Sequence, residues 1–300
     1  MIIGELAALG SVISGTATIT LFTYISDRVG VYIQTLWRLL FGLVVVGVAQ
    51  YFLAGSLFEH YETTAQVWYF VISGLIGFTI GDLFLFRSSI LLGPRLGILV
   101  FITYVPMATL LAVPLLGERM GFMDIIGMVI TLAGVVMVVL SGRNGAREGE
   151  FVPQKLLLGV LLGLMGALCN ALGLVLAKMG MVDSSVSVMN VLFIRILAAA
   201  SASWLFGLFA GYVRKTVKGP PSARLLGLTA IGAVTGPLLS VWLSLVAMRY
   251  TYTGIATTIM SIAPIVAIPM ARITHHERIT PQIIIGTVIA VAGVAVLFLW

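Results

Sequence analysis

The chain has 300 residues, of which 60% are hydrophobic and 9% are charged, and its net charge at pH 7 is +6. A soluble domain has about 45–50% apolar and about 25% charged residues, so this composition excludes a single water-soluble globular fold. The excess Lys and Arg residues form no clustered basic run, which argues against nucleic-acid binding and is typical of the cytoplasmic loops of membrane proteins.

Apolar stretches long enough to cross a bilayer follow one another along the whole chain. A helix needs about 20 mostly apolar residues to cross about 30 Å of hydrocarbon. Ten such stretches occur, at 3–24, 34–54, 67–91, 96–116, 121–141, 156–180, 188–210, 224–248, 254–273 and 281–299. Because the bilayer core has no water to bond the backbone, each stretch must be helical. The sequence predicts an all-α integral membrane protein with ten transmembrane helices.

The two halves of the chain share a motif at a constant offset. The motif is Glu-Arg, seven residues, Gly, five residues and Ala-Gly-Val, and it begins at Glu118 and again at Glu277. Five spans separate the copies, an odd number, so the copies face opposite ways across the membrane. The sequence therefore predicts two inverted five-helix repeats, 1–145 and 156–300, joined by a charged linker at 146–155.

Glycine pairs predict where helices approach each other closely. Gly77 and Gly81 are four residues apart in the third span, and Gly232 and Gly236 are four apart in the eighth. Small residues at this spacing share one helical face and let a neighbouring backbone come near.

The repeated motif resembles the drug/metabolite transporter superfamily, most closely its ten-span EamA-type branch. The resemblance rests on Gly117-Glu118-Arg119, the downstream glycines, and the prolines of the fourth and ninth spans, and it covers nearly the whole chain. It implies an alternating-access carrier, often an exporter of amino acids or other metabolites, without naming a substrate. The second copy departs from the pattern, because His275 and His276 stand before Glu277.

Basic residues are unevenly divided between the two sides of the predicted bundle. Eleven Lys and Arg residues fall on the side away from the termini, and three, Arg119, Lys178 and Arg249, fall on the side of the termini. The positive-inside rule then predicts a multi-pass protein of the cell (inner) membrane with both termini outside. The resemblance implies the reverse orientation, with the termini inside.

Charged side chains inside the spans are site candidates, because an unpaired charge in hydrocarbon is costly. Arg38, Asp82 and Arg87 fall at similar depths in the membrane. They are expected to form a structural ion cluster, or Asp82 is a proton-coupling carboxylate. Arg195, about two turns into the seventh span, is expected to bind a substrate carboxylate, to snorkel or to cap a broken helix. Glu5, at the start of the first span, is an interfacial anion at a helix N-terminus or a coupling residue.

Uncharged polar side chains form the rest of the predicted substrate cavity. They lie on spans that line the cavity in the family that the chain resembles, and Ser11 shares a helical face with two of them. The candidates are Ser14, Thr18, Tyr104, Asn170, Ser240, Trp242 and Ser261, together with Arg195. Each alone is more often a contact between helices than a ligand contact. The aromatic candidates Tyr104 and Trp242 suit a substrate with an apolar or aromatic part.

The sequence predicts a secondary transporter or exporter of small metabolites, first of all amino acids. Transport is expected to be proton-coupled or by facilitated diffusion, with the lipid bilayer as surroundings and a monomer or homodimer as the assembly. The alternative is an antiporter of phosphorylated or nucleotide-linked metabolites, which requires several Lys or Arg side chains facing the cavity.

Other classes of protein fit the sequence poorly. A membrane-embedded enzyme needs His, Asp or Glu residues clustered at an interface, and the sequence has no such cluster and no Gly-rich phosphate-binding loop, so no enzyme is expected. A non-transporting subunit needs no polar residues in both repeats. With Cys169 as the single cysteine and three histidines in loops, no metal site or cofactor is expected.

Overall fold

A computed structural model describes residues 2–117, 121–145, 153–182, 185–250, 259–260, 262–263, 265–267 and 281–299. Every regular element in these ranges is helical. Seven helices within them are long and apolar enough to cross a membrane, and two shorter apolar helices cover Ile125–Val138 and Pro281–Val296. These helices agree with the predicted all-α membrane protein. Most of the predicted ninth span, 254–273, lies outside the described residues.

The first half of the chain contains five of the predicted spans. Its elements are α1 (Ile2–Val29), α2 (Val31–Ala54), α3 (Thr64–Gly74), η1 (Leu75–Gly81), α4 (Asp82–Leu92), α5 (Pro94–Phe101), α6 (Tyr104–Leu116) and α7 (Phe122–Gly145). Gly30, with a φ of 88°, separates the first two helices. Pro106 has no N–H for the carbonyl of Ile102, so the fourth span is interrupted between α5 and α6.

Every regular element in the described part of the second half is also helical. Its elements are α8 (Pro153–Met181), α9 (Val188–Phe209), α10 (Tyr212–Lys218), α11 (Ala223–Ala233), η2 (Val234–Val241), α12 (Trp242–Tyr250) and α15 (Pro281–Leu299). Ser187 and Ser222 cap the N-termini of α9 and α11, where each hydroxyl accepts a backbone N–H three residues later.

A π-helical stretch interrupts one span in each half. We call α3, η1 and α4 the third span, and α11, η2 and α12 the eighth span. η1 begins at Leu75 and η2 at Val234, and these positions are 159 residues apart, as are the two copies of the sequence motif. Single π-helical turns within α-helices are rare and concentrate at functional sites. Their matched positions link the two halves by structure as well as by sequence.

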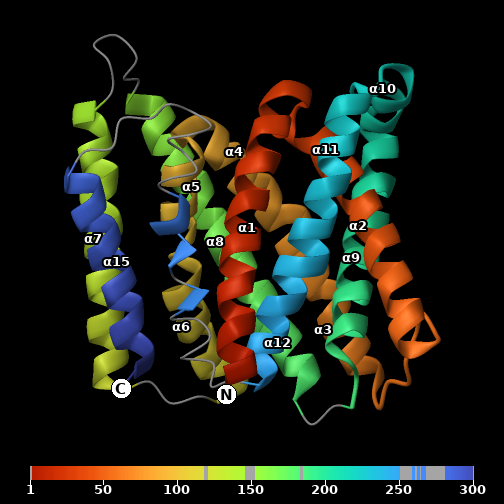
Figure 1. Cartoon of the computed structure of the whole chain (residues 1–300), viewed down its shortest axis with the longest axis horizontal. Helices are drawn as coiled ribbons and strands as arrows, with labels where there is room; N and C mark the ends of the chain where they lie inside the picture. Colours follow the sequence, from red (N-terminus) through yellow and green to blue (C-terminus); the bar gives the residue numbers. More distant parts are fainter. Residues whose placement is uncertain are drawn as a thin grey trace.

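Helices of one half pack mainly on helices of the other half. The third span packs on α8, and the eighth span packs on α1. In addition, α2 packs on α9 and α7 packs on α15, whose ribbons run side by side in Figure 1. The first element of each half is thus covered by the π-interrupted span of the other.

The repeated motif of the two halves is explained by this packing. Gly134 and Gly293 are the glycines of the two Ala-Gly-Val triplets, and both lie where α7 meets α15. A Cβ atom on Gly134 would lie 2.3 Å from the Ala290 nitrogen, and one on Gly293 would lie 2.3 Å from the Thr131 nitrogen. Such distances leave no room for a side chain, so the motif permits backbone contact between two helices.

The predicted glycine faces also mark close contacts. A Cβ atom on Gly232 would lie 2.3 Å from the ring of Phe22, and one on Gly236 would lie 2.5 Å from the Thr18 methyl group. The eighth span therefore lies closely against α1, as expected for small residues at this spacing.

Different elements lie at the two ends of the bundle. The first turn of α1 and the last turn of α15 lie at one end, and α10 lies at the other (Figure 1).

The outer faces of the bundle expose large apolar side chains such as Phe52, at 82%, and Phe209, at 85%. Exposed apolar surface on this scale is expected when lipid is the solvent.

Candidate functional site

A cavity of about 210 Å³ lies between helices of both halves of the chain. Its described wall is built from α1, η1, α5, α6, α8, α9, η2 and α12, with Met260 and Ala263. The polar lining residues are Ser11, Thr16, Tyr104, Asn170, Arg195, Ser240 and Ser244. The apolar part of the wall includes Phe78, Phe101 and Leu174. A mostly apolar wall with a few convergent polar groups is the usual composition of a small-molecule site.

Half of the predicted cavity residues line this cavity. Tyr104, Asn170, Arg195 and Ser240 do so, although they come from four different spans. Ser261 lies outside the described residues. The structure therefore brings together residues that are as far apart as positions 104 and 240 in the sequence.

Ser14 and Thr18 are placed elsewhere, between α1 and η2. The Ser14 hydroxyl donates to the Thr235 carbonyl, and the Thr18 hydroxyl lies 2.8 Å from both the Ser14 carbonyl and the Thr235 hydroxyl. Neither residue is among those that line the cavity. Their observed contacts join two helices, which is the commoner role of such residues in membranes.

Trp242 also lies away from the cavity lining. Its half-buried side chain packs against the core cluster that includes Leu39, Phe193 and Leu245. Trp242 directly follows η2, and a π-helical turn contains one residue more than an α-helical turn. The extra residue rotates the side chains that follow by about 100°, so the assumption of an unbroken α-helix predicted the wrong face for Trp242.

Ser11 and Ser240 form a reciprocal pair in the cavity wall. The Ser11 hydroxyl donates to the Ser240 carbonyl and the Ser240 hydroxyl donates to the Ser11 carbonyl, both at 2.9 Å. Gly15 allows this approach, because a Cβ atom there would lie 2.6 Å from the Ser240 hydroxyl oxygen. Ser244 stands nearby on the lining and donates to the Val241 carbonyl at 2.7 Å.

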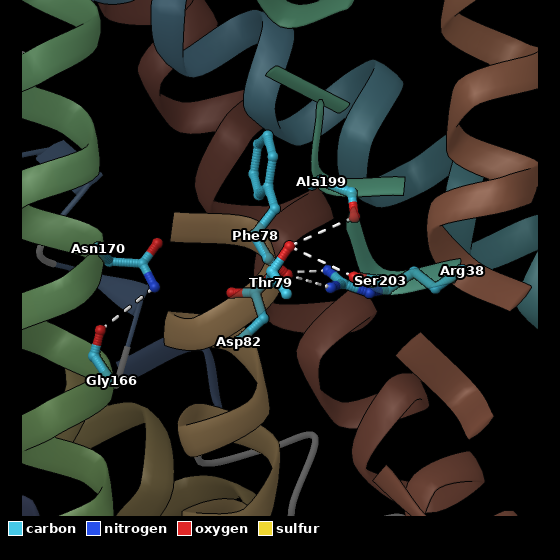
Figure 2. Close-up of polar contacts among 8 residues, drawn as sticks. All are labelled: Arg38, Phe78, Thr79, Asp82, Gly166, Asn170, Ala199 and Ser203. Atoms are coloured by element: carbon cyan, nitrogen blue, oxygen red, sulfur yellow. Dashed lines mark hydrogen bonds and ion pairs between the residues drawn. The ribbon is translucent and has the colours of Figure 1, made fainter. Parts of the chain in front are cut away.

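Asn170 links the cavity to the crossing of α8 and the third span. Its side chain extends from α8 toward η1, and its amide nitrogen donates to the Gly166 carbonyl at 3.3 Å (Figure 2). A Cβ atom on Gly81 would lie 2.7 Å from that nitrogen, so the third span reaches Asn170 through glycine.

Arg195 is a buried cation in the cavity wall. The residue is 5% exposed, and its guanidinium carbon lies 4.7 Å from the centre of the Phe78 ring. Its Nε atom has no hydrogen-bond partner, and the guanidinium forms no ion pair, among the residues that the structure describes. The third span lies close to the backbone of this residue, since a Cβ atom on Gly74 would lie 2.2 Å from the Arg195 carbonyl oxygen.

Arg38 and Asp82 form a buried ion pair beside the cavity. Arg38 Nη1 donates to Asp82 Oδ2 at 2.6 Å, and Nη2 donates to the Phe78 carbonyl at 3.0 Å (Figure 2). The Phe22 and Phe86 rings lie 5.7 and 5.3 Å from the guanidinium carbon. The pair joins α2 to the third span and is not part of the lining.

The remaining charged candidates lie apart from the cavity. Arg87 is exposed and takes no part in the ion pair, so the expected three-residue cluster is reduced to Arg38 and Asp82. Glu5 is half-buried in the first turn of α1, where the helix dipole favours an anion.

Some residues of the cavity wall were missed by sequence reasoning. Thr16, Phe78 and Phe101 line the cavity, yet no polar pattern or motif marks them in the sequence. Proximity to the glycine pair of the third span was the one signal that pointed toward Phe78. No group of three or more His, Cys, Asp or Glu residues in the described ranges can hold a metal ion.

Comparisons with known proteins agree with this architecture. The EamA-like transporter family matches the chain twice, over residues 2–140 and 157–299. A solved structure titled "Crystal structure of protein" is 21% identical, covers 99% of this chain and 96% of its own, and superposes with a TM-score of 0.67. This likeness concerns the fold alone. No functionally curated protein matches the sequence. Since the family match spans nearly the whole chain in two halves, the protein belongs to the EamA-like transporter family.

Proposed function

We propose that the protein is a secondary active transporter of small metabolites, first of all amino acids and related compounds. It works by alternating access, with its substrate site near the membrane midplane. The observation that carries this proposal is the cavity of about 210 Å³ whose wall comes from both halves of the chain. Rocking of one half against the other would change which side of such a cavity is open.

The proposal includes ten spans arranged as two inverted five-helix repeats. Three features support it: the family matches each half separately, the π-helical stretches are 159 residues apart, and the packing is reciprocal. The third span packs on the first helix of the second half, and the eighth span packs on the first helix of the first half. Reciprocal packing of this kind is expected when a pseudo-two-fold axis relates two repeats.

The cavity suits a small amphipathic solute. Ligand pockets for drug-sized molecules measure about 300–1,000 Å³, so a volume of about 210 Å³ favours a compact metabolite. Ser240 and Asn170 offer polar contacts, while Phe101 and Tyr104 offer an aromatic wall. An amino acid has both a polar end and an apolar side chain.

The antiporter of phosphorylated metabolites receives less support from the lining. A phosphate dianion calls for several cationic side chains, and Arg195 is the one cation in the described lining. Lys178 lies in the last turn of α8, outside that lining.

A transport assay with a matched pair of variants tests the proposal. Purified protein in liposomes preloaded with unlabelled amino acids is expected to accumulate the labelled amino acid by exchange. Ser244→Phe, which fills the cavity, should reduce the exchange rate at least tenfold. Ser201→Phe, on the exposed face of α9, is the control and should leave the rate unchanged. Equal rates in protein-free liposomes, or equal rates in both variants, would contradict the proposal.

A further inference from the structure

We propose that the cavity binds the zwitterion of an amino acid, with its carboxylate on Arg195 and its ammonium group on the serine oxygens of the same cavity wall. This inference rests on the proposed function and goes further, because it assigns the two ends of the substrate to named residues. It follows from the charge balance of the buried groups and from the direction of the hydrogen bonds in the wall.

The buried charges in the described bundle do not cancel. Arg38 and Asp82 neutralise each other through a 2.6 Å hydrogen-bonded ion pair. Arg195, 5% exposed, is then left with one positive charge and no ion-pair partner among the described residues. A buried cation without a counter-ion is unfavourable, so an anion that enters the cavity gains free energy by pairing with it.

The Arg195 guanidinium is held in a fixed position for this contact. The Phe78 ring lies 4.7 Å from its central carbon, which restrains the plane of the group. Arg195 is also one of the residues that line the cavity. A planar fork of N–H donors matches the two oxygens of a carboxylate, so Arg195 is suited to hold one in a bidentate pair.

Asp82 does not compete for Arg195 in this arrangement. It interacts with Arg195 electrostatically, but it accepts a hydrogen bond from Arg38 and forms its ion pair with that residue. The substrate carboxylate is therefore the counter-ion that the described part of the lining lacks.

The serine hydroxyls of the cavity point their protons away from a ligand. Ser11, Ser240 and Ser244 each donate to a backbone carbonyl. A hydroxyl has one proton and two lone pairs, so these oxygens remain available only as acceptors. An ammonium group is a donor of three hydrogen bonds, whereas a carboxylate offers none, so this wall selects the amino end of the substrate.

A binding experiment separates the two ends. Tryptophan fluorescence or thermal shift of the purified protein in detergent is titrated with valine, leucine and phenylalanine. Each is compared with its amide, which lacks the carboxylate, and with the corresponding deaminated acid, which lacks the ammonium group. A ligand that binds the folded protein raises its melting temperature, so the shift reports binding. At least one amino acid is expected to bind at least tenfold more tightly than both of its analogues, because each analogue leaves one set of buried polar groups unpaired.

Variants assign each end to a residue. Arg195→Gln should weaken binding of the amino acid and of the deaminated acid by about tenfold to a hundredfold while leaving the amide unaffected. Arg195→Lys keeps the positive charge but loses the planar fork of N–H donors. Its affinity for the amino acid should therefore fall between those of the wild type and of Arg195→Gln. Ser244→Ala should weaken binding of the amino acid but not that of the deaminated acid. Arg87→Gln, an exposed arginine outside the cavity, is the control and should bind as the wild type does.

Each other outcome overturns the inference. Amides that bind as tightly as the amino acids remove the role of Arg195, and deaminated acids that bind equally remove the role of the serines. A panel in which no compound binds also overturns it. In all these cases the exchange assay still decides the proposed function, and selective binding without exchange would contradict transport while leaving the assignment of the two ends intact.

Discussion

At the scale of single residues, two buried arginines play different parts. Arg38 has an acidic partner and also satisfies the Phe78 carbonyl, so it connects α2 to the third span. The Arg195 guanidinium carbon lies 4.7 Å from the centre of the Phe78 ring, and Arg195 lines the cavity. The Arg38 charge is paired with Asp82 within the described protein, whereas we propose that the Arg195 charge is paired by a substrate carboxylate.

The pair formed by Arg38 and Asp82 predicts a stability effect. Asp82→Asn leaves a buried guanidinium without its counter-ion, so we expect a loss of about 3–5 kcal/mol in the free energy of unfolding. Arg87→Gln, at an exposed position, should change it by less than about 0.5 kcal/mol. Denaturant unfolding in detergent measures both values.

The same variant separates the two interpretations of Asp82. The double variant Arg38→Gln with Asp82→Asn should lose less stability than Asp82→Asn alone, because no buried charge then remains unpaired. If Asp82→Asn were as stable as the wild type but its transport no longer depended on pH, Asp82 would instead be a proton-coupling residue.

At the scale of elements, glycine determines which helices touch. α7 and α15 meet at the glycines of the repeated motif, where each backbone lies against the other. The motif that relates the chain to its family therefore serves packing, whereas the cavity lies between other spans. In a bilayer, close van der Waals contact replaces the hydrophobic driving force between helices.

Identical substitutions at two glycines test this contact. Gly134→Ala places a methyl group 2.3 Å from the Ala290 nitrogen, so we expect a loss of at least about 1–3 kcal/mol in the free energy of unfolding. Gly227→Ala in α11 meets no atom within 4 Å and should cause no loss. Thermal unfolding in detergent compares the two, and equal stability would show that α7 and α15 do not depend on this contact.

At the scale of the whole molecule, the distribution of charge predicts an orientation. Lys215 and Arg224 lie at the α10 end of the bundle, and Glu59 and Glu62 lie in the loop between α2 and α3 at the end that holds the termini. We propose that the α10 end is cytoplasmic, as the positive-inside rule requires.

Single cysteines test the orientation in intact cells. With Cys169 replaced by Ala, Glu62→Cys should react with a membrane-impermeant maleimide, and Lys215→Cys should react only after the cells are opened. Both positions are exposed, so a difference in labelling reports the side of the membrane rather than burial. The reverse pattern would place the termini inside, as the family resemblance implies.

The sequence by itself determined the class of the protein, the number of apolar stretches and the family. These properties are local or periodic: a run of about 20 apolar residues matches the bilayer thickness wherever it occurs. The offset of 159 residues is likewise a property of the chain, and the two π-helical stretches repeat it.

Only the tertiary structure decided which polar residues face the cavity. Ser11 and Ser14 share a helical face in the sequence, yet Ser11 lines the cavity while Ser14 bonds to Thr235. The physical reason is that lipid and protein interior are equally apolar, so hydrophobic periodicity does not reveal the inner face of a membrane helix. The π-helical turns then rotate the faces that follow them, and the partner of each buried charge depends on which helices meet.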